Sequence, residues 1–348
     1  MIGAGGPSRS CTAIAGSNIA LVKYWGKRDA ALNLPATGSL SLTLAELGTR
    51  TTVRFSGDGA EDQVTLNGAP AADQVRARVG AFLDRVRARA GIDRRADVVS
   101  ENSVPTAAGL ASSASGFAAL ALAASRAAGL ALAPGELSEL ARLGSGSAAR
   151  SIFGGFVEMA AGTRADGRDA VAAPLAGAAD GAAAWDLRLV VAVTAAGPKA
   201  AGSTTAMEST ARTSPFYPAW VAGVPGDLVE ARAAIAARDL DRLGVVAERS
   251  ALRMHATAMA ADPAILYWNP TTLAAIQTTR ALRVAGTAAY FTIDAGPHVK
   301  VLCAPADVSA VAAALAATPG VLRTIVASPG PGARVIEETD LSRPGGAR

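Results

Sequence analysis

Strand-like and helix-like patterns of apolar residues alternate along most of this chain. Apolar or alternating runs bounded by glycine and proline predict strands at residues 14–22, 40–44, 51–55 and 63–66. Apolar residues at helical spacing predict a helix over residues 75–89, with five arginines largely on its other faces. Residues 102–125 carry no charge. Their strictly apolar part is far shorter than the roughly 20 residues of a membrane span, so we predict a buried helix there and no membrane association.

The same alternation continues through the second half of the chain. A strand pattern at residues 156–160 precedes an alanine- and glycine-rich surface excursion over residues 161–184. A continuous apolar strand at residues 187–194 then opens a second unit. Helical patterns follow at residues 221–261, 271–284 and 308–317, and strand patterns at residues 288–293, 299–303 and 322–327.

This order of elements predicts an α/β protein. With 348 residues, 50% of them hydrophobic and 18% charged, the chain is long enough for two cores. We therefore predict an N-terminal domain over residues 1–185, a C-terminal domain over residues 186–335 and a loose tail over residues 336–348.

Charge and cysteine content narrow the class of protein. The 33 basic and 29 acidic residues give a mild basic excess, which a small anionic substrate explains as well as a nucleic acid would. Cys11 and Cys303 lie far apart in sequence, so they form no disulfide framework and favour a reducing compartment such as the cytoplasm. No sustained apolar run precedes Lys23, so no secretory signal is expected. Neither His255 nor His298 lies in a nucleophile or metal-ligand pattern, which disfavours hydrolase and zinc chemistry.

Small residues and hydroxyls gather just before the uncharged helix. They are Pro105, Ala108, Gly109, Leu110, Ala111, Ser112, Ser113 and Ala114. Small residues let the backbone approach an anion closely, and the first N–H groups of a helix point toward it. No Gly-Lys-Ser or Gly-Lys-Thr follows, so any cation near a transferred phosphate comes from elsewhere. Taken alone, the loop fits a helix cap without a ligand equally well.

Lysine is rare in this chain, and two of the four lysines lie in Lys23-Tyr24-Trp25-Gly26-Lys27. A retained lysine suggests a role for a compact point charge on a flexible stem, able to follow a phosphate or a carboxylate. The alternative is a pair of lysines at a strand end beside a half-buried tryptophan.

Three further places carry candidate chemistry. Residues 144–151 combine closely spaced hydroxyls with Arg150, whose planar fork suits a carboxylate, although an N-cap with an incidental arginine is the alternative. Ser203 and Thr204 could hold phosphate oxygens, but such hydroxyls are more often turn residues. Asp294 ends an apolar run, where a carboxylate can hold a hydroxyl in line for attack on a phosphate or simply close an Asx-turn.

Taken in order, these motifs resemble the diphosphomevalonate decarboxylase family of the GHMP kinase superfamily. The matching segments are residues 18–35, 100–116, 144–155 and 292–297, and the resemblance extends over residues 12–327. It implies the GHMP kinase fold, with a ribosomal protein S5 domain 2-like N-terminal domain, a ferredoxin-like C-terminal domain and a cleft between them. It also implies ATP-dependent decarboxylation of 5-diphosphomevalonate to isopentenyl diphosphate, CO₂, ADP and phosphate, through phosphorylation of the 3-hydroxyl.

The resemblance further implies residue roles. Asp294 would orient the 3-hydroxyl and accept its proton, Lys23 would neutralise the phosphate in transfer, and Arg150 would position the carboxylate. The residues implied to bind the substrate are Tyr24, Trp25, Gly26, Lys27, Arg78, Ser145, Gly146, Ser147, Ala148, Ala149, Arg150, Ser203 and Thr204. The loop at residues 105–114 would bind ATP, and Mg²⁺ would be held through the ATP phosphates with Ser113 as a candidate protein ligand. A homodimer is common among such relatives.

Some positions depart from the family pattern. Ala149 stands in place of a cysteine and His298 in place of an asparagine, whereas Glu208 and Arg212 leave the contact to the terminal substrate phosphate unassigned. A relative acting on 5-phosphomevalonate or another 3-hydroxy acid therefore stays open, as does a kinase that stops at the 3-phosphate. A third hypothesis is a non-catalytic nucleotide- or RNA-binding module on the same fold. The retained Asp294 argues against that module, which has no need of a base.

Overall fold

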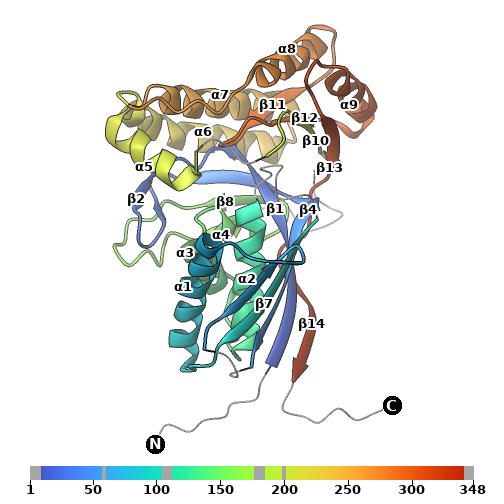
Figure 1. Ribbon diagram of the computed structural model, residues 1–348. Helices are drawn as coiled ribbons and strands as arrows, with labels where there is room; N and C mark the ends of the chain where they lie inside the picture. The colour runs from blue at the N-terminus through green and yellow to red at the C-terminus, as the bar shows by residue number, and fades with distance from the viewer. Residues whose placement is uncertain (1–8, 57–59, 104–111, 176–184, 198–200, 341–348) are drawn as a thin grey trace, which may run out of the picture.

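The computed structural model describes residues 9–56, 60–103, 112–175, 185–197 and 201–340 (Figure 1). One half of the molecule is built on an eight-stranded sheet in the order β14-β1-β4-β7-β5-β6, with β8 and β9 branching from β4. Its strands are β1 (Arg9–Val22), β4 (Ser39–Phe55), β5 (Gln63–Leu66), β6 (Ala69–Pro70), β7 (Ala96–Asn102), β8 (Phe156–Met159), β9 (Ala172–Pro174) and β14 (Arg334–Asp340). A separate hairpin pairs β2 (Lys27–Asp29) with β3 (Leu34–Pro35).

Helices pack against this sheet. They are α1 (Asp73–Ala90), α2 (Ser112–Ala127), α3 (Pro134–Gly144) and the short α4 (Ala148–Ser151). Helix α2 contacts both β1 and β4. Its alanines at positions 118, 119, 121, 123 and 124 are wholly buried, because small side chains let the helix lie close to the strands. The predicted uncharged helix is therefore a core helix.

The other half contains a four-stranded antiparallel sheet in the order β11-β12-β10-β13. The strands are β10 (Arg188–Val193), β11 (Tyr290–Ile293), β12 (Val299–Cys303) and β13 (Arg323–Ala327); the helices are α5 (Ser203–Thr213), α6 (Tyr217–Ala237), α7 (Leu240–Met259), α8 (Pro270–Val284) and α9 (Val308–Ala316). Val190 belongs to a core with α8 and α9, whereas Val191 belongs to a core with α6 and α7. Strand β10 is thus buried on both faces, which explains its continuous apolar run.

The end of β1 passes from the first half of the molecule into the second. Helix α7 contacts both β1 and β11 (Figure 1). The backbone N–H of Lys23, directly after β1, donates to Ser250 Oγ on α7 at 3.0 Å. This arrangement brings the segment after β1 close to the end of β11, although about 270 residues separate the two, as the Lys23–Asp294 bond below shows.

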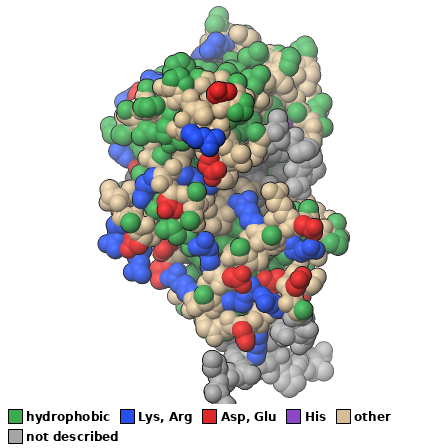
Figure 2. Space-filling view, turned by 60° about the vertical axis from the view of Figure 1, so that its left-hand side comes forward, with side chains coloured by type: hydrophobic (Ala, Val, Ile, Leu, Met, Phe, Trp, Pro, Cys, Tyr) green, Lys and Arg blue, Asp and Glu red, His purple; other side chains and the backbone are tan. Residues whose placement is uncertain are grey.

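In the face shown in Figure 2, charges of both signs interleave over the lower half of the molecule. The upper half, which contains α5 to α9, carries more hydrophobic side chains there. On this face the mild basic excess therefore does not gather into one basic stripe of the kind that follows a nucleic-acid backbone. Within the described ranges, the helices include none long and apolar enough to cross a bilayer.

Several elements differ from the sequence prediction. The strands expected at residues 40–44 and 51–55 are one strand, β4, because it pairs with β1 on both sides of a register shift between Gly16 and Asn18. The helix expected over residues 221–261 is two helices, separated where Arg238 adopts a φ of 51°. Strand β7 and helices α3 and α5 were not predicted.

The C-terminal segment also differs from its prediction. Residues 336–340 were assigned to a loose tail, but they belong to β14, which pairs antiparallel with β1. That part of the prediction is wrong, because the order of β14 comes from a partner strand at the opposite end of the sequence. Residues 341–348 lie outside the described part of the chain. The domain limit at residue 185 stays a prediction.

Candidate active site

A carboxylate held between two lysines marks the centre of the site. Lys23 Nζ lies 2.7 Å from Asp294 Oδ1, and Lys300 Nζ lies 3.1 Å from Asp294 Oδ2. Both lysine side chains are buried, at 1% and 2% exposure, whereas Asp294 is 29% exposed. Three strands or strand ends, β1, β11 and β12, therefore supply one compact cluster of three charges.

The turn after β11 fixes Asp294. The N–H of Gly296 donates to the Asp294 carbonyl at 2.7 Å. The hydroxyls of Thr194 and Thr272 donate to the carbonyl of Pro297 at 2.8 and 2.7 Å. His298 Nδ1 accepts from the N–H of Thr194 at 3.2 Å, so the residue that departs from the family pattern also anchors this turn.

The electrostatics of the cluster keep the carboxylate ionised. Burial acts to raise the pKa of Asp294, but the charges and hydrogen bonds of the two lysines outweigh it and hold that pKa well below its usual range. Burial lowers the pKa of Lys23 to about 8, and Asp294 limits the fall. At neutral pH the pair is a carboxylate and an ammonium.

Trp25 anchors the segment that carries Lys23 and Lys27. Its ring is 1% exposed and meets the ring of Tyr267 edge-on at 6.3 Å between centroids. Its carbonyl accepts from Trp220 Nε1 at 3.0 Å. Because this tryptophan is fixed in the core, the lysines on either side are held at the cleft, where Lys27 Nζ lies 3.5 Å from the hydroxyl of Thr204.

Arg150 is fixed by neutral oxygens and not by a carboxylate. Its Nε donates to Ser41 Oγ at 2.9 Å, and its two terminal nitrogens donate to Ser39 Oγ at 2.5 Å and Asn18 Oδ1 at 3.1 Å. Asn18 Nδ2 in turn donates to the carbonyl of Ser147 at 3.0 Å. Each terminal nitrogen carries two hydrogens, so the guanidinium keeps donors and an uncompensated charge for an anionic ligand.

Tight packing surrounds the serine turn between α3 and α4. The hydroxyl of Tyr24 stands where a Cβ on Gly146 would lie, so a larger residue there would displace the tyrosine ring. Burial raises the pKa of Tyr24 above its ordinary value, and the tyrosine therefore stays neutral. Arg78 Nη2 donates to the carbonyl of Gly144 at 2.7 Å, and its guanidinium lies over the ring of Phe117 at 4.5 Å.

These groups open onto one cleft of about 710 Å³. The residues expected from the sequence that line it are Lys23, Tyr24, Trp25, Lys27, Arg78, Ser113, Ser145, Gly146, Ser147, Arg150, Ser203, Thr204 and Asp294. Four of them are cationic and one is anionic, so the cleft suits a ligand with several negative charges.

Other expected residues lie elsewhere. Ala148 and Ala149 are wholly buried in α4 and pack into the core, and Ala114 is 1% exposed within α2. Gly26 has a φ of 104° and packs against the hydroxyl of Tyr217. Helix α2 begins at Ser112, whose side chain is not described. Pro105, Ala108, Gly109, Leu110 and Ala111 lie outside the described residues.

Sequence reasoning missed two features of this site. Lys300 is not singled out in the sequence analysis, and neither are Ser39 and Ser41. Two features could have identified Lys300: lysine is rare in this chain, and Lys300 lies on the strand that follows the aspartate turn. Three of the four lysines lie at this site, and Lys199 is outside the described residues.

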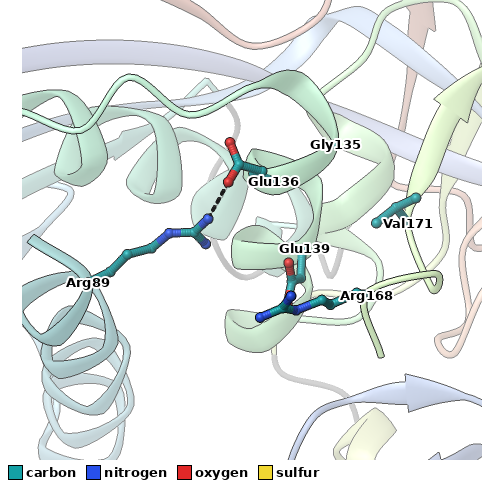
Figure 3. Close-up of a pocket in the computed structure, with 6 residues that line it drawn as sticks. All are labelled: Arg89, Gly135, Glu136, Glu139, Arg168 and Val171. Atoms are coloured by element: carbon teal, nitrogen blue, oxygen red, sulfur yellow. Dashed lines mark hydrogen bonds and ion pairs between the residues drawn. The ribbon is translucent and has the colours of Figure 1, made fainter. Parts of the chain in front are cut away.

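A second hollow, of about 570 Å³, lies outside the cleft (Figure 3). It is lined by Arg89, Gly135, Glu136, Glu139, Arg168 and Val171. Arg89 Nη2 lies 2.6 Å from Glu136 Oε1, and in Figure 3 the side chains of Glu139 and Arg168 lie close to one another. These charges face each other, so the hollow lacks the excess of cations that distinguishes the cleft.

Two family models match the chain. The diphosphomevalonate decarboxylase-like N-terminal domain matches residues 15–172, and the mevalonate 5-diphosphate decarboxylase C-terminal domain matches residues 189–326. The diphosphomevalonate decarboxylase of Gibberella zeae is 38% identical over 299 residues, which are 81% of this chain and 77% of that relative.

Solved structures agree. The crystal structure of mevalonate diphosphate decarboxylase from Staphylococcus aureus superposes with a TM-score of 0.89 at 39% identity, over 95% of this chain and 98% of that one. A further structure, MDDEF in complex with MVAPP, AMPPCP and magnesium, has a TM-score of 0.88 at 40% identity, over 95% and 99% of the two chains. The predicted α/β fold class is confirmed. Together with the matching domains, these likenesses show that the chain belongs to the diphosphomevalonate decarboxylase family.

Proposed function

We propose that the cleft catalyses the ATP-dependent decarboxylation of 5-diphosphomevalonate, with Asp294, Lys23 and Arg150 in the catalytic roles. The observation that carries this assignment is the position of Asp294, which lies between two lysines in the same cation-lined cleft as Arg150. A carboxylate acceptor, a mobile point charge and a planar fork are the groups that phosphorylation followed by decarboxylation requires.

The described residues fit ATP with its magnesium ion. Ser113 lines the cleft in the first turn of α2, where unpaired N–H groups and the helix dipole favour phosphate. Hydroxyl and phosphate oxygens are ligands that Mg²⁺ prefers, so Ser113 and the ATP phosphates would hold it. When bound, Mg²⁺ screens the negative charge of the phosphates. Asp294 pairs with two lysines, and we assign it to the 3-hydroxyl of diphosphomevalonate and not to the metal ion.

In the first step the 3-hydroxyl attacks the γ-phosphorus of ATP, the bond to the bridging oxygen breaks, and ADP leaves. Asp294 accepts the hydroxyl hydrogen bond and takes its proton as the phosphoryl group arrives. Because such transition states are loose, the hydroxyl needs orientation more than prior deprotonation, and an anion with a low pKa supplies it. Lys23, which lines the same cleft, stabilises the oxygens of the phosphoryl group.

In the second step the 3-phosphate leaves with the electrons of its C–O bond. The electrons of the bond to the carboxyl carbon then form the new double bond, and CO₂ is released. Arg150 binds the substrate carboxylate through its remaining donors and holds the breaking bond in line with the departing phosphate. Its rigid frame of Ser39, Ser41 and Asn18 supplies the precision that this alignment needs.

Product stoichiometry tests this function. Purified protein with ATP, Mg²⁺ and 5-diphosphomevalonate is expected to release ADP and CO₂ in equal amounts, and to act much more slowly on 5-phosphomevalonate. ADP release and ¹⁴CO₂ release are followed in the same reaction. ADP without CO₂ would show a kinase that stops at the 3-phosphate, and a higher kcat/KM with 5-phosphomevalonate would reassign the substrate.

The pH dependence of kcat/KM should reflect the ionisation of Lys23. Since the ammonium is the reactive form and its pKa is lowered to about 8, kcat/KM is expected to fall as pH rises through about 8, well below the range of an ordinary lysine. Lys23→Arg, which cannot deprotonate in this range, is expected to be slow but to lack that limb. A rate of the unaltered protein that stays constant to pH 10 would contradict the assignment.

Quaternary structure and location complete the proposal. A homodimer rests on the family resemblance and is testable by light scattering. Cytoplasmic location rests on the cysteines: Cys11 and Cys303 are both buried and free, as expected in a reducing compartment.

A further inference from the structure

Lys300 lies behind the catalytic carboxylate, away from the cleft. It is on β12 directly opposite Thr292 of β11, and its side chain is 2% exposed. Its Nζ lies 3.1 Å from Asp294 Oδ2. Lys23 and Asp294 line the cleft, whereas Lys300 is not among the described residues that do so.

The two lysines therefore hold the carboxylate from different sides. Lys23 takes Oδ1 and also donates to the carbonyl of Ala20 at 2.7 Å. Lys300 takes Oδ2 from the interior. A substrate phosphate in the cleft can compete with Asp294 for Lys23, which lines the cleft, but not for Lys300, which is not among the described lining residues.

We infer that Lys300 is a positioning residue for the decarboxylase reaction: it holds Asp294 charged and oriented toward the substrate hydroxyl while Lys23 engages the transferred phosphate. The inference rests on the proposed function, because it assigns Asp294 to that hydroxyl. Without Lys300, each engagement of Lys23 by phosphate would leave the carboxylate free to rotate. A buried ammonium is costly unless it is paired, so a lysine at this place is explained by the charge that it stabilises.

The charged and titratable groups around the pair make the inference testable through pH. Those that act on Lys23 are Asp294 from β11, Lys300 from β12, Arg150 from α4 and His255 from α7. Lys300 and Arg150 lower the pKa of Lys23, which burial already depresses. His255 is itself held neutral, because burial lowers its pKa to about 3. Removing the charge of Lys300 therefore raises the pKa of Lys23 and moves the alkaline limb of kcat/KM to higher pH.

The test is Lys300→Met, which keeps the length of the side chain without its charge. We expect kcat to fall about tenfold or more, because an acceptor held in place contributes on the order of 10²- to 10⁴-fold. The KM for both substrates should stay within about threefold, since Lys300 does not line the cleft. The pH at which kcat/KM falls should rise by roughly half a pH unit or more, as expected for the loss of a like charge nearby. Lys300→Arg keeps the charge and should keep the limb near its original pH.

Thr292→Val is the matched control. Thr292 lies opposite Lys300, is wholly buried and donates to the carbonyl of Ala20 at 3.3 Å. Its removal disturbs the same packing without changing any charge, so the alkaline limb should not move. Melting temperatures of all variants show whether they are folded. If Lys300→Met does not fold, Lys300→Gln gives the same comparison.

Two outcomes would overturn the inference: a kcat within twofold of the unaltered enzyme, or a lowered kcat with an unmoved alkaline limb, which would show that the charge of Lys300 does not act on the Lys23–Asp294 pair. Asp294→Asn separates this failure from failure of the proposed function. If Asp294→Asn is inactive while Lys300→Met behaves like the unaltered enzyme, only the role of Lys300 is lost. If Asp294→Asn remains active, the assignment of Asp294 fails as well.

Discussion

Asp294→Asn is expected to lower kcat by about 10²- to 10⁴-fold while ATP binds as tightly as before. Asparagine has nearly the shape of aspartate but no negative charge, so it cannot orient the tertiary hydroxyl as an anion or take its proton. It also leaves Lys23 and Lys300 without their counter-charge, 2.7 and 3.1 Å away. The variant should therefore also be less stable, since two buried ammonium groups lose their partner.

Asp227→Asn is the control that separates these two effects. Asp227 is 2% exposed on α6 and pairs with Arg249 at 2.8 Å. Its replacement removes a buried carboxylate from an ion pair without affecting the cleft, so a lower melting temperature with nearly normal kcat is expected. Turnover is measured by ADP release, and ATP affinity by titration with a fluorescent analogue. If Asp294→Asn loses no more activity than Asp227→Asn, Asp294 does not accept the hydroxyl.

The catalytic residues of the site were more predictable from the sequence than the residues that hold them in position. Asp294, Lys23 and Arg150 lie in short motifs to which the family resemblance gives roles, and the structure brings all three to one cleft. The pairing of Lys300 with Asp294 depends on the register of β11 and β12, in which Ile293 lies opposite Val299. No local pattern specifies that register, so the second lysine appears only in the fold.

The helices and strands also were predictable where local patterns decide them and not where distant contacts do. Local signals sufficed where a strand is buried on both faces, as β10 is, or where an apolar stripe is regular, as in α1. They failed for β14, whose residues are ordered by pairing with β1, and for α5, whose hydroxyl-rich first turn is typical of a loop. The interaction that orders β14 comes from a distant part of the chain, and α5 packs against β2 and α7.

Arg150→Lys is expected to lower kcat/KM by about 100-fold, although the positive charge is kept. The guanidinium is held by three side chains on two strands, and its planar shape lets it grip a carboxylate with two parallel bonds. An ammonium is a single point with a flexible stem. It can satisfy Asn18 or the substrate carboxylate, but not in the plane that decarboxylation requires, and a misplacement of about 1 Å costs on the order of 100-fold.

The loss should fall on the second step at least as heavily as on the first. We expect CO₂ release to decrease as much as ADP release or more, so that the ratio of CO₂ to ADP does not exceed one. Arg142→Lys is the matched control, because Arg142 is wholly buried and donates to the backbone carbonyls of Leu32, Gly167 and Ala170. That substitution should lower the melting temperature with kcat/KM per folded molecule nearly unchanged. An Arg150→Lys enzyme that retains kcat/KM within threefold would show that the charge alone is sufficient and that the planar grip on the carboxylate plays no part.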